Sequence, residues 1–251
     1  MSRIYLVALF GCLCATPASA EVTLPGGRKL EQIDFERHVM GLFSRAGCNA
    51  AACHGSFKGQ GGFRLSLFGY EPDKDFLAVA RETMGRRINP ANPDESLLLL
   101  KPTGKVGHGG GIRFGKGSWE YRILRAWIGQ GAPWKKGSGQ VAQLVLTPPE
   151  IAFKKAQEEQ PIKVSARYGD GSHEDVTAFC DFRSNDDAVA QVSNLGIVNS
   201  LRPGSTAIIV SYRGNVQPVR VLVPMELPAG FIYPQIPERN YVDREVFARL
   251  R

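Results

Sequence analysis

The sequence has little cysteine, little histidine and no long hydrophobic run after its first twenty residues. Five cysteines and four histidines occur in 251 residues. Residues 1–20 contain one basic residue, Arg3, then the apolar run Ile4–Leu13 and Ala18-Ser19-Ala20. This pattern predicts a cleaved secretory signal peptide and no membrane span. Cleavage would remove two cysteines, and the odd number that remains argues against a fold held together only by disulfides.

The chain also lacks a basic stripe interleaved with aromatic residues, so we expect no nucleic-acid partner. Its formal net charge is +7. A basic protein suits an acidic redox partner or an anionic surface, although a basic balance is equally compatible with simple solubility. Together with the signal peptide, this predicts a periplasmic or otherwise exported protein without a transmembrane segment in the mature chain.

One short motif carries recognisable chemistry: Cys48 and Cys53 are separated by four residues, and His54 follows directly. Two thiols can bond to the vinyl groups of a haem while the adjacent histidine ligates the iron, and the usual spacing between the thiols is two residues. The two extra residues should cost roughly a few tenths of a kcal/mol in loop closure. We expect Ala50–Ala52 to form an extra helical turn. The motif predicts one covalent haem c, with His54 as the proximal iron ligand.

Two other readings of the motif stay open. Cys48 and Cys53 could form a disulfide beside a surface histidine, which would make the chain a haem-free secreted surface or carbohydrate-binding module. Alternatively, both thiols and two histidines could bind zinc, but the adjacent Cys53 and His54 would then have to bend onto one small ion.

The candidate distal iron ligand is His108, which lies between Gly107 and the glycines 109–111. Glycines let the backbone approach a planar ligand closely, and they give a histidine little packing in a core. The alternatives are an exposed loop histidine at this position and Met84 as the ligand, although we expect Met84 to pack against other side chains. If His108 were unbound, an open iron position would permit peroxide or gas chemistry.

Four helices are expected in the first half of the chain. Asp34 and Ser118 are candidate N-caps, His38 should lie on a solvated helix face, and Met40 should pack beside the core. The expected helices are Glu31–Arg45, Asp73–Thr83, Ser96–Lys101 and a Ser118-capped helix that ends at Gly129.

Residues 33–134 resemble the cytochrome c-like domain at the head of large secreted proteins of planctomycete-type bacteria. The resemblance rests on the Cys48–Gly55 motif and on four further segments: Gly62–Leu67, Gly85-Arg86-Arg87 with Ser96–Lys101, His108–Gly111, and Trp127-Ile128 before Gly131-Ala132-Pro133. It implies haem c on Cys48 and Cys53, with His54 proximal. Ordinary cytochromes c have methionine in the loop where this chain has His108. The resemblance therefore also favours ligation of the iron by two histidines. Arg64, Arg87 and Arg113 could then pair with the haem propionates.

The second half of the chain alternates in the manner of short strands separated by glycine-rich turns. It resembles a bacterial Ig-like group 2 domain in Tyr168–Ser172, Asp175-Val176-Thr177, Ser184 before Asp186, and Gly196-Ile197-Val198. The resemblance implies a spacer role, a docking role or contact with a cell surface or polysaccharide. The expected strands are Leu144–Leu146, Ile162–Tyr168, Val176–Phe182, Ala188–Val192, Ile197–Val198, Thr206–Tyr212 and Val219–Val223.

The sequence therefore predicts a multidomain chain in which an all-α cytochrome c-like domain is followed by an all-β Ig-like sandwich. The expected boundaries are a signal peptide at 1–20, a haem domain at 31–134, a flexible linker at 135–142 and a sandwich at 143–224. Residues 225–251 would form a proline-rich linker and the start of a truncated further domain. The expected function is electron transfer by an exported protein that is not an enzyme.

Overall fold

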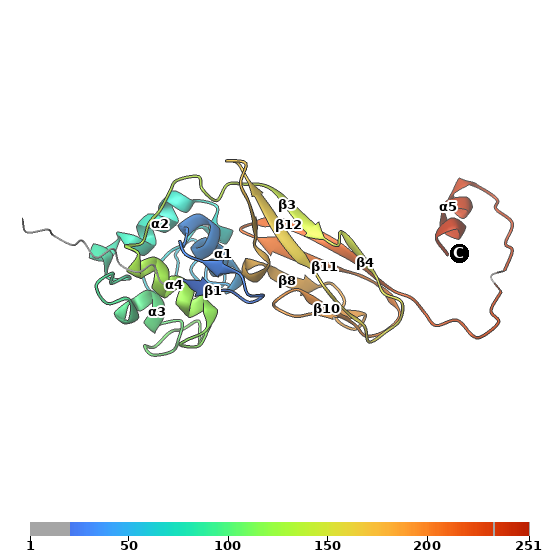
Figure 1. Ribbon diagram of the computed structural model, residues 1–251, viewed down its shortest axis with the longest axis horizontal. Helices are drawn as coiled ribbons and strands as arrows, with labels where there is room; N and C mark the ends of the chain where they lie inside the picture. Colours follow the sequence, from blue (N-terminus) through green and yellow to red (C-terminus); the bar gives the residue numbers. More distant parts are fainter. Residues whose placement is uncertain (1–20, 233, 251) are drawn as a thin grey trace, which may run out of the picture.

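The chain divides into a helical part and a strand-rich part that lie side by side along the long axis of the molecule (Figure 1). The structure is a computed structural model that describes residues 21–232 and 234–250. After the strands, an extended segment leads away to helix α5, Tyr241–Leu250. The predicted signal peptide lies outside the described residues.

The helical part consists of short elements joined by long turns. It begins with the small antiparallel pair β1 (Val22–Thr23) and β2 (Lys29–Leu30). A π-helical segment, η1, continues directly into helix α1. The further elements are η1 (Phe35–Val39), α1 (Met40–Arg45), η2 (Leu67–Gly69), α2 (Pro72–Ala80), η3 (Thr83–Gly85), η4 (Pro93–Glu95), α3 (Leu97–Leu100) and α4 (Trp119–Gly129).

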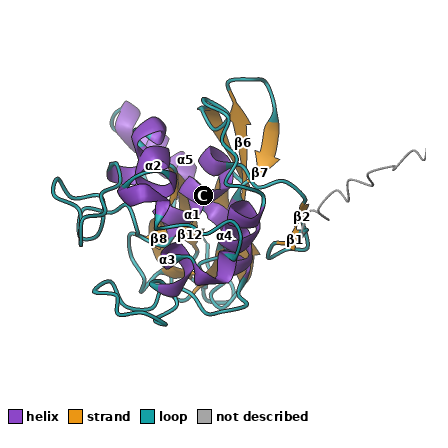
Figure 2. Ribbon diagram, turned by 90° about the vertical axis from the view of Figure 1, so that its left-hand side faces the viewer, coloured by secondary structure: helices purple, strands orange, loops and turns teal. Residues whose placement is uncertain are grey.

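The predicted all-α cytochrome c-like domain is wrong. Among the described residues the chain is mainly β, with four sheets built from β1–β12. The longest helix in the helical part, α4, has 11 residues, and the predicted helix Ser96–Lys101 shrinks to the four residues of α3. The glycine-rich segments between these helices form turns because glycine is a poor helix former. Figure 2 shows how much of this end of the molecule is loop.

Two helix starts follow from local chemistry as expected. The Asp34 side chain accepts a hydrogen bond from the Arg37 N–H at 2.8 Å, and the Ser118 hydroxyl accepts one from the Tyr121 N–H at 3.3 Å. These bonds satisfy N–H groups that have no partner within the helix. Met40 is buried in the core, as predicted. The centre of the helical core is Trp127, whose ring lies 5.4 Å from that of Phe35.

The strand-rich part contains three sheets. Strands β5, β10 and β9 form one antiparallel sheet, β3, β6 and β7 form another, and the third has the order β4-β12-β11-β8 with β4 parallel to β12. The strands are β3 (Val141–Thr147), β4 (Glu150–Ala152), β5 (Glu159–Pro161), β6 (Lys163–Tyr168), β7 (His173–Asp175), β8 (Asp181–Ser184), β9 (Ala190–Val192), β10 (Ile197–Ser200), β11 (Gly204–Tyr212) and β12 (Asn215–Val223).

The predicted strand Val176–Phe182 is wrong. A 3-10 turn, η5 (Thr177–Phe179), interrupts it, and strand β8 begins only at Asp181. The Thr177 side chain explains the break, because its hydroxyl accepts a hydrogen bond from the Val164 N–H at 2.8 Å and so replaces a strand partner. The assignment of this part to the Ig-like group 2 family stays a prediction.

A buried polar cluster joins the two parts. His38 is 4% exposed, so the expected solvated position is wrong. Its Nδ1 accepts the Asp34 N–H at 2.9 Å and its Nε2 donates to Glu174 of β7 at 2.6 Å. Arg28 also pairs with Glu174. On the same interface, the Tyr212 hydroxyl of β11 donates to the Arg37 carbonyl at 2.8 Å.

The expected flexible linker is instead fixed by Glu36, which is 2% exposed. Its carboxylate accepts hydrogen bonds from Trp134 Nε1 at 3.0 Å, from the Gly137 N–H at 2.7 Å and from the Gly139 N–H at 3.1 Å. Arg213 of the β11–β12 turn lies 3.8 Å from the same carboxylate. A buried carboxylate needs such donors, so these bonds anchor residues 134–139 to η1.

Asn240 directly precedes helix α5, and its side-chain oxygen accepts hydrogen bonds from the N–H groups of Val242 and Asp243. Within residues 21–232 and 234–250, no helix combines the length and the apolar character that crossing a membrane requires.

The interface should lose stability in acid. Burial raises the pKa of Glu174, but the hydrogen bond from His38 and the bond and charge of Arg28 outweigh it and lower this pKa to about 2 from its usual 4.5. A lowered carboxyl pKa stabilises the folded state above about pH 4.5, and the gain disappears as the pH falls towards 2. We expect Glu174→Gln to lose on the order of 2–3 kcal/mol of unfolding free energy at pH 7.

Urea unfolding of both proteins between pH 2 and pH 7 measures this effect, and the difference should shrink below pH 4.5. Glu150→Gln, on an exposed residue of β4, is the matched control and should change little. A difference between wild type and Glu174→Gln that does not vary with pH would contradict the assignment.

Candidate haem site

The segment from Cys48 to Gly55 is a compact turn that follows α1. The Cys48 N–H donates to the Phe43 carbonyl at 2.8 Å, which continues the path of the helix. The Cys53 and Gly55 N–H groups both donate to the Ala50 carbonyl, and the His54 N–H donates to the Cys48 carbonyl at 3.0 Å. Residue 50 lies in a bend and residues 51 and 52 lie in a turn, so the expected helical turn is wrong. The two extra residues form a hydrogen-bonded loop instead.

Gly55 is required by the closeness of this turn. A Cβ atom at position 55 would lie 2.0 Å from the Asn49 carbonyl oxygen, which no side chain can tolerate. Asn49 is buried, and its side-chain amide donates to the Ser44 hydroxyl of α1 at 3.0 Å. Its carbonyl also accepts the Phe68 N–H at 3.2 Å. Asn49 therefore ties the turn both to α1 and to the following loop.

The imidazole of His54 is oriented by Phe63. Its Nδ1 lies 2.9 Å from the Phe63 carbonyl oxygen, and because that oxygen can only accept, Nδ1 carries the hydrogen. The Nε2 lone pair is then free to bind a metal, which is the usual arrangement of a ligating histidine. Burial lowers the pKa of His54, which favours this neutral form at pH 7.

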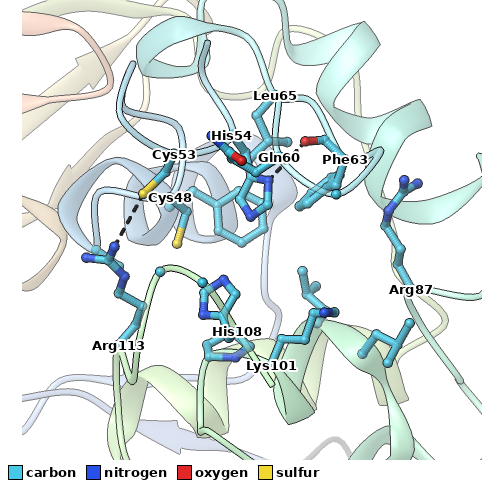
Figure 3. A pocket seen from close by; sticks show the side chains of 18 of the residues that line it. Cys48, Cys53, His54, Gln60, Phe63, Leu65, Arg87, Lys101, His108 and Arg113 are labelled. Atoms are coloured by element: carbon cyan, nitrogen blue, oxygen red, sulfur yellow. Dashed lines mark hydrogen bonds between the residues drawn. The ribbon is translucent and has the colours of Figure 1, made fainter. Parts of the chain in front are cut away.

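The imidazole of His108 is held in the same manner from the other side of the cavity. Its Nδ1 lies 2.8 Å from the Gly111 carbonyl oxygen, which again leaves Nε2 free. The centres of the two imidazole rings are 6.2 Å apart, and the ring planes differ by 13°. Figure 3 shows the rings facing one another across the cavity. The structure thus brings the predicted proximal and distal ligands together from positions 54 residues apart in sequence.

Both thiols of the motif lie beside this histidine pair and are free. No disulfide joins Cys48 to Cys53, so the geometry gives the disulfide alternative no support. Burial raises the pKa of Cys48 to about 12. The Cys53 sulfur accepts a hydrogen bond from the Arg113 guanidinium at 3.3 Å. The third thiol, Cys180, is buried in the strand-rich part, where it donates to the Val176 carbonyl.

The cavity between these groups has a volume of about 580 Å³, which is within the usual range for small-molecule and cofactor sites. Apolar side chains form much of its wall, among them Leu42, Phe43, Leu65, Leu98 and Phe114. The described residues that line it include no aspartate or glutamate, whereas four arginine or lysine side chains do: Arg86, Arg87, Lys101 and Arg113.

Met84 is not part of this cavity. Its side chain is fully exposed, which overturns the expectation that it packs against other residues. The preceding residue, Thr83, does line the cavity. Met84 is therefore not placed as an alternative iron ligand in this structure.

The arginines expected near haem propionates are only partly brought together. Arg87 and Arg113 line the cavity, but Arg64 does not, and its guanidinium lies over the Phe57 ring instead. Sequence analysis missed Arg86 and Lys101 as lining residues, although both lie within segments that carried the family resemblance. It also missed the role of the Phe63 carbonyl, for which no sequence signal exists because every residue has a carbonyl group.

The classification of the chain as a metal-binding cytochrome c is corrected by the described side chains. In residues 21–232 and 234–250, no group of three or more His, Cys, Asp or Glu residues is arranged to hold a metal ion. The zinc alternative, which needs both thiols and two histidines on one ion, is therefore wrong, and the general label of a metal-binding chain is not supported. A porphyrin supplies its own ring nitrogens and needs only axial ligands from a protein, so such a cluster is a different kind of site.

Comparison with known proteins gives no family. No family model matches the chain, and no curated protein matches it. A solved structure of the S-layer protein SbsC, domains 4 and 5, is similar at 18% sequence identity, over 34% of this chain and 53% of that chain. The chain thus matches about half the length of that structure. The TM-score is 0.28, which establishes no shared fold.

The tightness of the turn gives a direct test. Gly55→Ala should displace the Asn49 carbonyl and with it His54, at a cost of about 2 kcal/mol or more in unfolding free energy, as for other overpacked sites. Gly115→Ala is the matched control, because a Cβ there meets no atom within 4 Å. Urea unfolding compares the two variants, and equal stabilities would refute the proposed close contact.

Proposed function

We propose that the chain is an exported electron-transfer protein that holds one covalent haem between His54 and His108, with thioether bonds to Cys48 and Cys53. The observation that carries the proposal is the pair of facing imidazoles, each held by a backbone carbonyl with its Nε2 free. A bound haem would supply an iron that exchanges one electron between its ferrous and ferric states.

The separation of the imidazoles fits two axial ligands of one metal. A bond from a metal to an imidazole nitrogen is about 2 Å long, so two imidazoles on opposite sides of one ion have ring centres roughly 6 Å apart. The observed value is 6.2 Å. Histidines that merely lie on the same surface need neither this spacing nor the matching Nδ1 hydrogen bonds.

The chain's other residues supply what a covalent porphyrin needs. The thiols of Cys48 and Cys53 are free beside the histidine pair, and the carbonyl of Cys48 fixes the backbone of His54 relative to the first thiol. The apolar side chains of the cavity wall would exclude water from a bound porphyrin, and the low dielectric constant of that setting would tune the reduction potential. Two histidine ligands give a lower potential than a histidine–methionine pair.

The setting of the site follows from the rest of the sequence. Residues 1–20 resemble a secretory signal, which favours a periplasmic or otherwise exported location. The formal net charge of +7 favours an acidic redox partner. We further propose that the strand-rich part, which resembles an Ig-like group 2 domain, serves as a spacer or contacts a cell surface or polysaccharide. The resemblance to the planctomycete-type haem domain supports the cofactor assignment but not an all-α fold.

Covalent attachment is tested by intact mass and visible absorption of the exported protein, made in cells that have a haem-attachment system. We expect a gain of one haem, with the colour retained on the denatured chain. Cys48→Ser and Cys53→Ser should each remove one thioether bond, whereas the matched control Cys180→Ser should keep both. A colourless chain two protons lighter than its reduced form would replace this proposal with a haem-free secreted binding module.

The distal ligand is tested by His108→Ala in the haem-loaded protein. Loss of the second imidazole should convert a six-coordinate low-spin absorption spectrum to a high-spin one. Met84→Ala is the control, and its spectrum should match that of the wild type. An unchanged spectrum in His108→Ala, or a high-spin one in Met84→Ala, would refute the ligand assignment. A haem-loaded wild type with a high-spin spectrum would indicate an open iron position.

A further inference from the structure

We infer that the end of the cavity opposite the thiols is a subsite for carboxylate groups, formed by Arg86, Arg87 and Lys101. This inference rests on the proposed haem function and deepens it, because it fixes which way round the porphyrin lies. Figure 3 shows Arg87 and Lys101 on one side of the histidine pair and Cys48 and Cys53 on the other.

The guanidinium of Arg87 is fixed in position and has N–H donors left for an anion. Its guanidinium donates to the Ala78 carbonyl at 2.6 Å and to the Gly62 carbonyl at 2.8 Å, and it lies 4.6 Å from the centre of the Phe63 ring. A guanidinium has five N–H donors, so these two carbonyls and a third, longer bond to the Glu82 carboxylate leave two donors available. Its acidic neighbour, Glu82, is 3.5 Å away and is not part of the cavity wall.

Lys101 and Arg86 add to this positive end. The Lys101 ammonium donates to the Gly107 carbonyl at 3.1 Å, which places it beside the loop that carries His108, and two of its three donors remain. Arg86 is exposed at the rim. No aspartate or glutamate among the described residues lines the cavity, and whereas Arg87 pairs with Glu82 outside it, Arg86 and Lys101 form no ion pair in the described part of the chain.

The thiol end and the cationic end of the cavity match the two edges of a protoporphyrin ring. The vinyl groups and the propionates of protoporphyrin lie on opposite edges of the ring. Thioether bonds to Cys48 and Cys53 would therefore direct the two propionates to the end where Arg87 and Lys101 lie. Arg113 lies at the thiol end, 3.3 Å from the Cys53 sulfur, and is thus excluded from this subsite. Arg64 lies outside the cavity wall.

The test uses the full chain carrying Cys48→Ala and Cys53→Ala, so that haem binds without covalent bonds. Two probes, iron protoporphyrin IX and its dimethyl ester, are titrated by absorbance. In this background Arg87→Gln and Lys101→Gln should each weaken binding of the free acid by about 10-fold, as expected for loss of a charge-assisted hydrogen bond. Neither should change binding of the ester, which lacks the charges. Arg64→Gln is the matched control and should leave both affinities unchanged.

The outcomes are distinct. Equal losses for both probes, or a larger selective loss in Arg113→Gln, would overturn the subsite while leaving the proposed haem site standing. If neither probe binds any variant, the proposed function falls and the subsite falls with it. Arg87→Gln removes the hydrogen bonds to the Ala78 and Gly62 carbonyls and so could disturb the fold. In that case the Lys101→Gln result alone decides the test. Arg87→Lys should then recover part of the selectivity for the free acid, because it restores the charge without the planar fork.

Discussion

The structure depends on one buried carboxylate. Glu36 accepts hydrogen bonds from Trp134 and from two backbone N–H groups of the segment that connects the two parts of the chain. This carboxylate could not remain buried without such donors. It therefore fixes the connection, the helical segment η1 and the β11–β12 turn, which contributes Arg213, in one arrangement. Next to it, Gly41 of α1 permits the close approach of Tyr212 and Phe179 from the strand-rich part.

The contacts around Glu36 and Gly41 also position one wall of the cavity, because helix α1 leads directly from them to Cys48. The helix is held at one end against the strands and delivers the first thiol at the other, where the Cys48 N–H still bonds back to Phe43. The opposite wall comes from a separate segment, in which the Arg113 N–H donates to the Pro102 carbonyl at 2.7 Å and closes the loop that carries His108. The histidine pair thus meets between two independently anchored segments.

Much of the local structure could be predicted from sequence, whereas long-range contacts could not. The caps at Asp34 and Ser118 depend on neighbours three residues away. The burial of His38 depends on Glu174, which is 136 residues further along the chain. The ordered linker was missed for the same reason, because glycine and serine suggest flexibility unless a distant carboxylate such as Glu36 binds their backbone. The wrong all-α expectation came from reading short apolar segments as full helices.

The longer spacing between the cysteines is accommodated by backbone hydrogen bonds within the turn. The hydrogen bond from the His54 N–H to the Cys48 carbonyl closes the loop, and the bonds to Ala50 take up the inserted residues within it. The backbone positions of Cys48 and His54 are thereby coupled directly, through the hydrogen bond between them. What the turn cannot vary is Gly55, since its contact with the Asn49 carbonyl sets how tightly the loop closes. The relative positions of Cys48 and His54 in this turn therefore follow from the backbone bonds that close it and from the close contact at Gly55.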